Sequence, residues 1–378
     1  MRILIFDSEI SGHHLEYIHH LYDAATKDFQ NQYVFIVNKD FDAVKDKLVW
    51  QKSDNIKCIQ LNNEKQRKCD NKNLLLASWY KSKIVKEYVK IFHIDQVWLI
   101  MFMQLMPFLP LLLINSRVKI IGVLYRIYLY EKENMTRMHL LLEIMRYKII
   151  VANSSIKNIL VLNDKRGTEI LNKKYNTNKF KYIPDPVPFI DKSKLKNVRV
   201  DFGITKNDIL YLHFGGLNRR KGTLLIMQAL DILSSKDLNN KVFIFAGKIH
   251  NDIKEEFYNL KTKNEHKCKI IVFDEFCSYE LINNLCFSSD CILIPYCNTN
   301  QSSGVLSYAG YFNKPVIAPS QGLLGNLVRN YALGISLDNI NCKSLSESLL
   351  IPIPNIKNKY SESHTIDAFV HCWYSCEH

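Results

Sequence analysis

ILYLHFGGLNRRKGTLLIMQAL, residues 209–230, reads as a strand, a short turn and a helix in direct succession. Residues 209–215 are an apolar, β-rich run that predicts a strand, and the helix begins near Gly222. Gly215 and Gly216 let the backbone at the end of this strand approach a neighbouring group closely. A strand that passes through such a turn into a helix is the unit from which parallel α/β sheets are built.

Three basic residues, Arg219, Arg220 and Lys221, stand at the N-terminal end of this helix. Cations beside exposed backbone N–H groups make an anion site that suits a diphosphate. The turn lacks the GxxxxGK[ST] pattern of a phosphate-binding P-loop, and a solvated basic turn is the alternative interpretation.

Apolar, β-rich runs alternate with helical patterns on both sides of this unit. In the first half of the chain we expect strands over residues 2–6, 33–37, 57–61, 96–102, 119–125 and 158–162, and helices near 14–25, 74–91 and 134–149. In the second half we expect strands over residues 209–215, 241–247, 269–273, 291–296 and 315–318. This alternation predicts an α/β protein with parallel sheets covered by helices.

A polar stretch with Pro and Lys residues, 183–200, separates the two sets of strands. We therefore expect two parallel-sheet domains, over residues 1–183 and 207–360, joined by a linker over 184–206. Residues 361–378 end the chain with a predicted amphipathic helix. Because ligands of open α/β sheets lie at the carboxyl ends of the strands, the expected site is a cleft that both domains face.

Two further turns carry candidate anion-binding residues. Ser302, Ser303 and Gly304 precede a helix of small and apolar residues, whose first N–H groups are left for an anion. Ser11 and Gly12 lead from the first strand into the first helix in the same way. There is no GxGxxG, so the signal for a dinucleotide is poor, and an ordinary strand-to-helix turn is the alternative.

The charge of the chain is unevenly spread. Among 378 residues, 50 Lys and Arg stand against 37 Asp and Glu, which gives a net charge of +13. Residues 1–187 carry 29 basic and 19 acidic side chains (+10), and residues 188–378 carry 21 and 18 (+3). A basic surface indicates an anionic partner, and no nucleic-acid-binding motif accompanies it, so an acidic membrane is the stronger expectation. The composition, 47% hydrophobic and 23% charged, excludes a disordered or fibrous protein.

Two segments of the first half bear on a membrane. Residues 97–114, VWLIMFMQLMPFLPLLLI, contain one polar residue over a length that can span a bilayer, but Pro107 and Pro110 interrupt them. We expect a buried strand that runs into a buried helix, with membrane contact as the alternative. The basic run 65–90 mixes Lys and Arg with Leu, Trp and Tyr. A solvated helix face is its first interpretation, and a membrane-surface helix is the second.

Neither the histidines nor the cysteines predict a metal site. His13, Glu16 and His20 can share a helix face, but HExxH is absent, and the ten cysteines include no CxxC pair. Scattered cysteines indicate a reducing cytosol without disulfides. The N-terminus lacks the apolar core of a signal peptide.

Four segments in the second half resemble a known family. In order and spacing, FGGLNRRKG, VFIFAGK, IIVFDEFCSYELINNLCFSSDCILIPY and NKPVIAPSQGLLGNLV are similar to the C-terminal half of a retaining GT-B glycosyltransferase of family 4. The resemblance covers residues 182–336; YIPDPV (182–187) is similar to the family's linker strand, and SGHHLEY (11–17) takes the place of its glycine-rich donor loop.

This resemblance implies two Rossmann-like domains that face a cleft. It implies that the C-terminal domain holds a nucleotide-sugar donor, that the N-terminal domain holds the acceptor, and that the last helix packs back on the N-terminal domain. It implies no cofactor and no catalytic metal, because basic side chains and helix N-termini neutralise the leaving diphosphate.

The match to the family is partial at the level of single residues. Lys221 corresponds to the family's diphosphate-binding lysine, and the arginine five residues earlier corresponds to Gly216. The family's Glu-x7-Glu pair falls at Asn300 and Tyr308, so the chain is a variant that lacks the pair and must recognise the ribose differently.

We assign Lys221 and Arg220 to the leaving phosphate, and His13 to the orientation of acceptor or donor, as the candidate catalytic residues. The candidate donor-binding residues are Gly12, Gly216, Arg219, Gly247, Phe276, Ser302, Ser303, Gly304 and Tyr308.

The resemblance implies a hexosyltransferase that acts on a glycan or lipid-linked acceptor in surface polysaccharide or glycolipid synthesis. We expect a cytoplasmic protein, peripheral on the inner face of an anionic membrane, with no nucleic-acid partner. Two alternatives stay open: a non-catalytic binding subunit derived from a transferase, and a sugar-nucleotide 2-epimerase on the same fold.

Overall fold

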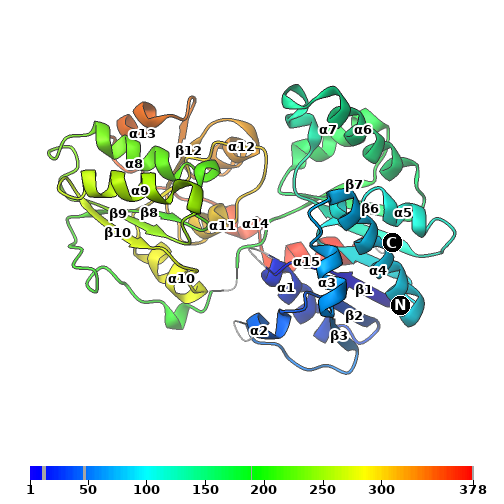
Figure 1. The fold of residues 1–378 in the computed structure, drawn as a ribbon. Coiled ribbons are helices and arrows are strands. Elements are labelled where there is room, and N and C mark those ends of the chain that lie inside the picture. Colours follow the sequence, from blue (N-terminus) through cyan, green and yellow to red (C-terminus); the bar gives the residue numbers. More distant parts are fainter. Residues whose placement is uncertain (11–13, 46–47, 189, 377–378) are drawn as a thin grey trace. The chain divides into compact units, whose positions relative to one another are not determined.

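The computed structural model describes residues 1–10, 14–45, 48–188 and 190–376, and Figure 1 shows its fold. These residues form two compact units. Unit 1 is Met1–Asp185 with the described residues from Ile366 on, and unit 2 is Pro186–Thr365. The stretch between the two sheets lies in unit 2, where the Val198 N–H donates to Ser288 Oγ (3.0 Å).

Unit 1 contains a parallel sheet of seven strands. They are β1 (Arg2–Phe6), β2 (Gln32–Val37), β3 (Ile56–Gln60), β4 (Gln96–Leu99), β5 (Lys119–Leu124), β6 (Ile156–Leu162) and β7 (Phe180–Ile183). The order in the sheet is β3-β2-β1-β4-β5-β6-β7. The helices are α1 (His14–Lys27), α2 (Phe41–Lys45), α3 (Asn63–Cys69), α4 (Leu74–Phe92), α5 (Phe108–Leu112), α6 (Arg137–Ala152), α7 (Lys165–Tyr175) and α15 (Ile366–Tyr374), with short 3-10 turns at Phe102–Leu105, Tyr128–Tyr130 and Lys132–Asn134.

Side chains of the unit 1 strands alternate between two apolar cores, because successive residues of a strand point to opposite faces. In β1, Ile3 and Ile5 pack with α1 and α15, whereas Leu4 and Phe6 pack with α4, α5, α6 and α7. Both faces are covered, which explains why these strands read as continuous apolar runs.

The apolar segment 97–114 contributes to both of these cores: Trp98 and Ile100 pack with α1 and α15, and Val97 and Leu99 pack on the other face. Its first four residues, Val97–Ile100, have no exposed surface, and the chain then passes through the 3-10 turn Phe102–Leu105 into α5. The prediction of a buried strand is confirmed, whereas the helix that follows is only partly buried, because Leu109 is buried and Leu111 is 50% exposed. In the described part of the chain, no helix has both the length and the apolar character that a transmembrane span requires.

Unit 2 contains a parallel sheet of six strands. They are β8 (Ile209–Phe214), β9 (Lys241–Ala246), β10 (Lys269–Phe273), β11 (Cys291–Leu293), β12 (Val316–Pro319) and β13 (Gly334–Leu337), in the order β10-β9-β8-β11-β12-β13. Its helices are α8 (Thr223–Ile232), α9 (Asn251–Asn264), α10 (Tyr279–Ser288), α11 (Gly304–Tyr311), α12 (Gly322–Asn330), α13 (Cys342–Ser348) and α14 (Tyr360–Ser363), with 3-10 turns at Lys192–Lys194 and Arg219–Lys221.

Two features of the unit 2 sheet differ from the sequence prediction. β11 ends at Leu293 instead of residue 296, because Pro295 has no N–H to donate to a neighbouring strand. The short edge strand β13 was not predicted, since the four residues GISL carry neither a long apolar run nor a clear alternation.

The last helix, α15, completes the core of unit 1. Its Trp373 ring lies 5.3 Å from the ring of Trp98 in β4, and its Phe369 ring lies 5.0 Å from that of Tyr17 in α1. Trp98, Trp373 and Phe369 are fully buried. The sheet of unit 1 is therefore closed on one face by residues far away in sequence, since Trp373 follows Trp98 by 275 positions.

We predict that Trp373→Ala lowers the free energy of unfolding of unit 1 by about 3–5 kcal/mol, because it leaves a large cavity beside Trp98. Chemical denaturation followed by circular dichroism measures this loss. His371→Ala, an exposed position on the same helix, should change stability by no more than about 0.5 kcal/mol. Equal losses in the two variants would contradict the packing role of Trp373.

Candidate functional site

The order of strands in unit 2 fixes where a ligand is expected. β8 lies between β9 and β11, and the chain leaves β8 toward β9 on one side and β11 toward β12 on the other. Such a switch point leaves a crevice at the carboxyl ends of the two central strands, where open α/β sheets bind ligands. The loop after β8 and the loop after β11 therefore supply the candidate site residues.

The loop after β8 places the ammonium group of Lys221 directly over Gly215. A Cβ built on Gly215 would lie 2.4 Å from Lys221 Nζ, and the backbone there has a φ of +93°. The positive φ favours glycine at this position, and the absence of a Cβ leaves the space that the ammonium occupies. Two hydrogen bonds hold the turn: Asn218 Oδ1 accepts from the Lys221 N–H (3.0 Å), and Arg220 O accepts from the Cys297 N–H (2.8 Å).

Tyr296, in the loop after β11, joins the two basic residues to the start of α11. Lys221 Nζ lies 5.6 Å and Arg220 Cζ lies 5.8 Å from the centroid of its ring, within the range of a cation–π interaction. Ser303 Oγ, at the N-cap of α11, donates to the Tyr296 hydroxyl (3.2 Å). The structure thus brings Lys221, Arg220, Ser303 and Gly304 together around a tyrosine that sequence analysis missed.

Other predicted donor-binding residues of unit 2 occupy different surroundings. The Arg219 guanidinium faces α9, 3.1 Å from Glu256 Oε2 and 3.8 Å from Asp252 Oδ2. Gly247 serves close packing, because a Cβ there would lie 1.9 Å from Gly215 O. A Cβ on Gly216 would meet nothing nearer than Asn218 Nδ2 at 3.9 Å, so the space beside it is open.

The remaining predicted residues of unit 2 divide between core and surface. Tyr308 lies in the core, and its ring meets that of Phe214 edge-on at 5.4 Å. Phe276, after β10, is largely exposed, and Ser302 is half-buried. A tyrosine in the core at position 308 offers no carboxylate to a ribose.

In unit 1, the carboxyl end of β1 carries an Asp–His pair. Asp7 is buried, and its Oδ2 lies 2.6 Å from His14 Nδ1 at the start of α1. Asp7 Oδ1 accepts from the Glu9 N–H (3.0 Å), so both carboxylate oxygens are engaged. A carboxylate that accepts from Nδ1–H leaves Nε2 of the ring as the acceptor nitrogen. The predicted residues Gly12 and His13 lie outside the described residues.

A hollow of about 270 Å³ lies at the carboxyl ends of β4 and β5 in the same unit. Its lining combines methionines and tyrosines with two ion pairs, Arg126–Glu131 (3.2 Å) and Arg146–Glu143 (2.5 Å). The hydroxyl of Tyr125, also in the lining, is buried and has no hydrogen-bond partner among the described residues. Burial raises the pKa of Tyr125 well above its ordinary value, and the nearby Asp7 adds to the rise.

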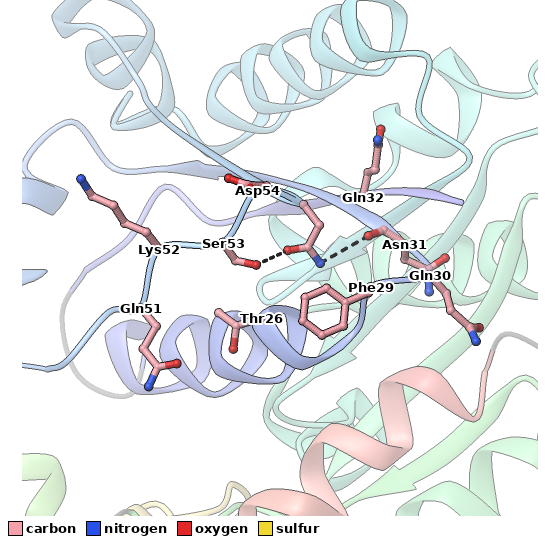
Figure 2. Close-up of a pocket in the computed structure, with 10 residues that line it drawn as sticks. Thr26, Phe29, Gln30, Asn31, Gln32, Gln51, Lys52, Ser53 and Asp54 are labelled. Atoms are coloured by element: carbon pink, nitrogen blue, oxygen red, sulfur yellow. Dashed lines mark hydrogen bonds between the residues drawn. The ribbon is translucent and has the colours of Figure 1, made fainter.

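The larger hollow in Figure 2, about 660 Å³, lies at the opposite edge of this sheet. Its lining precedes β2 and β3, at the amino ends of the strands. The side-chain amide of Asn55 donates there to Ala25 O (2.9 Å) and Asp28 O (2.6 Å), so it holds the loops together. This hollow is structural rather than a candidate site.

No family model matches this chain, and no curated protein matches its sequence. Solved structures do match it over its whole length. HepE from Anabaena, in complex with UDP and glucose, superimposes with a TM-score of 0.69 at 15% identity over 99% of this chain and 98% of that one. WaaG, a glycosyltransferase involved in lipopolysaccharide biosynthesis, gives 0.67 at 13% identity over 100% and 94%. Sucrose-phosphate synthase from Thermosynechococcus elongatus gives 0.65 at 12% identity over 92% and 88%.

The fold is that of the GT-B glycosyltransferases. Two parallel-sheet α/β units, of seven and six strands, form it. Among the described residues of either unit, no three His, Cys, Asp or Glu side chains gather as metal ligands would.

Beneath the switch point, His213 of β8 links the two central strands. Its Nδ1 lies 2.9 Å from Leu293 O in β11, and its Nε2 lies 3.0 Å from Thr223 Oγ1 at the start of α8. Because a carbonyl oxygen only accepts, Nδ1 carries the proton and Nε2 accepts from the threonine hydroxyl. Burial lowers the pKa of His213 to about 4, and the charge of Lys221 contributes, so the ring is neutral at pH 7.

We predict that His213 makes unit 2 less stable as the pH falls from about 6.5 to 4. The unfolded chain binds a proton at this histidine below its ordinary pKa, whereas the folded chain does not until about pH 4. In His213→Asn, whose amide N–H can still reach Leu293 O, the decline between pH 6.5 and 5 should be smaller by about 1.5 kcal/mol. Urea denaturation at several pH values measures the free energy of unfolding of both proteins. If the free energy falls with pH to the same extent in the variant and the unmodified chain, His213 is not the group responsible.

Proposed function

We propose that this chain is a glycosyltransferase that moves a sugar from a nucleoside diphosphate donor to an acceptor. The observation that carries the proposal is the position of Lys221 on a GT-B fold: its ammonium lies over Gly215 at the switch point, beside Arg220 and the start of α11. HepE, which shares the fold, is seen in complexes with UDP and with UDP-glucose, which supports a donor of this class.

The chemistry follows from the charge that develops when the donor breaks. Cleavage of the bond from the anomeric carbon to the diphosphate leaves negative charge on the departing oxygen, and preorganised cations and N–H groups stabilise it. We assign Lys221 and Arg220 to this phosphate, with the first N–H groups of α11, at Ser303 and Gly304, as further donors. We infer a retaining reaction of the family 4 type, with a hexose as the transferred sugar.

In unit 1 we place the acceptor, a glycan or a lipid-linked sugar. The Asp7–His14 pair holds an imidazole at the carboxyl end of β1, and the hollow beside Tyr125 offers methionine and paired-charge surfaces for an amphipathic group. An acceptor hydroxyl that donates a hydrogen bond to His14 Nε2 would be oriented by the ring, and the imidazole is the group that would take its proton. We propose a role in surface polysaccharide or glycolipid synthesis, performed by a cytoplasmic protein peripheral on the inner membrane face.

Because side-chain cations neutralise the diphosphate, the proposal includes no catalytic metal and no cofactor. Turnover with a chelator present should equal turnover without it. A requirement for a divalent cation would show that Lys221 and Arg220 do not suffice for the leaving group.

A second candidate function, nucleotide-sugar binding without transfer, is favoured by one observation. Tyr308 is packed in the core at a position where the family carries its ribose-binding glutamate, so that contact is lost. A 2-epimerase would need acid and base side chains around the sugar. Incubation with a panel of nucleotide sugars distinguishes the transferase from the binding subunit and the 2-epimerase. Release of nucleoside diphosphate supports the transferase, and epimerised donor supports the 2-epimerase.

Lys221→Ala is predicted to lose about 2–4 kcal/mol of transition-state stabilisation, because the variant removes the cation nearest the leaving phosphate. The measurement is kcat/KM for nucleoside diphosphate release. Arg219→Ala provides a matched control, since this arginine pairs with Glu256 of α9. Equal losses in the two variants would show that overall basicity, not the position of Lys221, matters.

Asp7→Asn is predicted to lower kcat/KM for the acceptor by about tenfold to a hundredfold, because the amide no longer fixes the imidazole of His14 as the carboxylate does. Donor binding, measured by calorimetry with the nucleoside diphosphate, should be unchanged because Asp7 belongs to unit 1. A loss of nucleotide affinity instead would place the pair on the donor.

A further inference from the structure

Helix α4 of unit 1 exposes the apolar side chains of its first turn and buries several polar ones beside its apolar core residues. Its first turn carries Leu74, Leu75 and Leu76, which are 81%, 55% and 45% exposed. Further along, Ser78 and Ser82 are buried and donate to Met106 O (3.0 Å) and Leu105 O (3.1 Å). Later in the helix, Ile84 and Val85 are buried in the core as in a helix that covers a sheet, so the exposed leucines are a feature of the first turn.

The neighbouring helix α5 extends this exposed apolar surface. α4 and α5 pack against each other (Figure 1), through the rings of Trp79 and Phe108 at 5.3 Å, both half-buried. Leu111, in the last turn of α5, and Ile114 just beyond it are 50% and 58% exposed. We call the five exposed residues the leucine patch: Leu74, Leu75, Leu76, Leu111 and Ile114.

A second row of exposed apolar residues lies on α6, on the same side of the sheet. Met138, Leu141, Leu142 and Met145 recur at the spacing of one helix face and are all exposed. Because α4, α5 and α6 share one core against one face of the sheet, their outer sides point away from that same face. Exposed apolar area on this scale indicates an interaction surface rather than ordinary surface residues.

The sequence stretches that carry the leucine patch contain basic residues but no acidic ones. Residues 71–86 and 96–130 contain no Asp or Glu, but they include the exposed Lys72, Lys83 and Arg117. Lys83 Nζ lies 4.9 Å from the centroid of the Trp79 ring, so its stem runs along the apolar surface and its charge reaches the rim. Asp70, the nearest acidic residue before α4, accepts a hydrogen bond from Gln66 Nε2 (2.9 Å).

From this combination we infer that the outer side of α4 and α5 is a docking surface for an anionic lipid bilayer. Leucines enter the boundary between headgroups and acyl chains, Trp79 lies at the level of the headgroups, and Lys72, Lys83 and Arg117 meet lipid phosphates. A protein partner that covered the same surface would need acidic groups opposite Lys72, Lys83 and Arg117. Without them, these cations would face apolar groups. The proposed function includes a peripheral association with a membrane, and this inference names the surface and the lipid that would form it. Only the biological purpose of the association rests on the proposed function.

The first test is sedimentation with vesicles of phosphatidylcholine alone or mixed with phosphatidylglycerol, without any sugar substrate. The full chain should bind the anionic vesicles, with an affinity that falls as salt rises. The triple variant Leu74→Ser/Leu75→Ser/Ile114→Ser should bind at least about tenfold more weakly. Lys83→Glu should weaken binding to anionic vesicles by roughly fivefold because it removes a cation, and by a further factor because it introduces an anion.

The matched control is Phe29→Ser/Val49→Ser, which removes two equally exposed apolar side chains of unit 1 outside the leucine patch. It should bind vesicles as the unmodified chain does. Absence of binding to anionic vesicles, equal binding to neutral ones, or equal losses in control and patch variants would overturn the inference.

Brominated lipids give a second, independent readout. They quench tryptophans that reach the bilayer, and Trp98 and Trp373 are fully buried in the core. Quenching on binding should disappear in Trp79→Phe; quenching that persists would show that another surface meets the lipid. Nucleoside diphosphate binding by the patch variants should be unchanged, so a failure of the membrane inference and a failure of the proposed transferase are read from separate experiments.

Discussion

The close approach of the Gly215 carbonyl to Gly247 constrains the architecture of the donor side. A Cβ at Gly247 would lie 1.9 Å from Gly215 O, and Gly215 itself has a φ of +93°, which favours glycine, with Lys221 Nζ above it. The loops that follow β8 and β9 are thus held at van der Waals distance, and the cation is held at the switch point of the sheet. Tyr296 and the start of α11 are placed around this cation, since the tyrosine ring faces Lys221 and its hydroxyl accepts from Ser303.

Most of the fold could be predicted from the sequence, because each buried parallel strand is a short apolar run between turn residues. RILIF and KIIVF are strands over the predicted residues, and Val97–Ile100, the first residues of the apolar segment 97–114, are buried as expected. The failures have a common origin. β13 is too short to show a pattern, and β11 ends early because Pro295 lacks an N–H, so only pairing with neighbouring strands defines these two elements.

The candidate site could be predicted in part. Glycines followed by basic residues after a strand identified the loop of Lys221, but not which of its cations face the crevice. In the 3-10 turn Arg219–Lys221, successive side chains point about 120° apart, so one arginine meets Glu256 of α9 while the other meets Tyr296. Tyr296 follows an apolar run and gave a weak signal, as the aromatic residue just after a buried strand. The Asp7–His14 pair depends on a turn whose geometry the sequence does not reveal.

Helix α4 suggests a role for part of the excess positive charge in the N-terminal half of the chain. The buried face of α4 combines apolar residues such as Ile84 and Val85 with the polar Ser78, Lys81 and Ser82, whereas the three leucines of its first turn are exposed. The serines are buried because their hydroxyls bind the carbonyls of the turn before α5, and this allows the close approach that a bulky side chain would prevent. Exposed leucines lower solubility and gain nothing within the fold, so a local rule is broken without a compensating contact inside unit 1. A compensating contact outside the chain, with an apolar and anionic partner such as a bilayer surface, accounts for both the exposed leucines and the lack of Asp and Glu in residues 71–86 and 96–130.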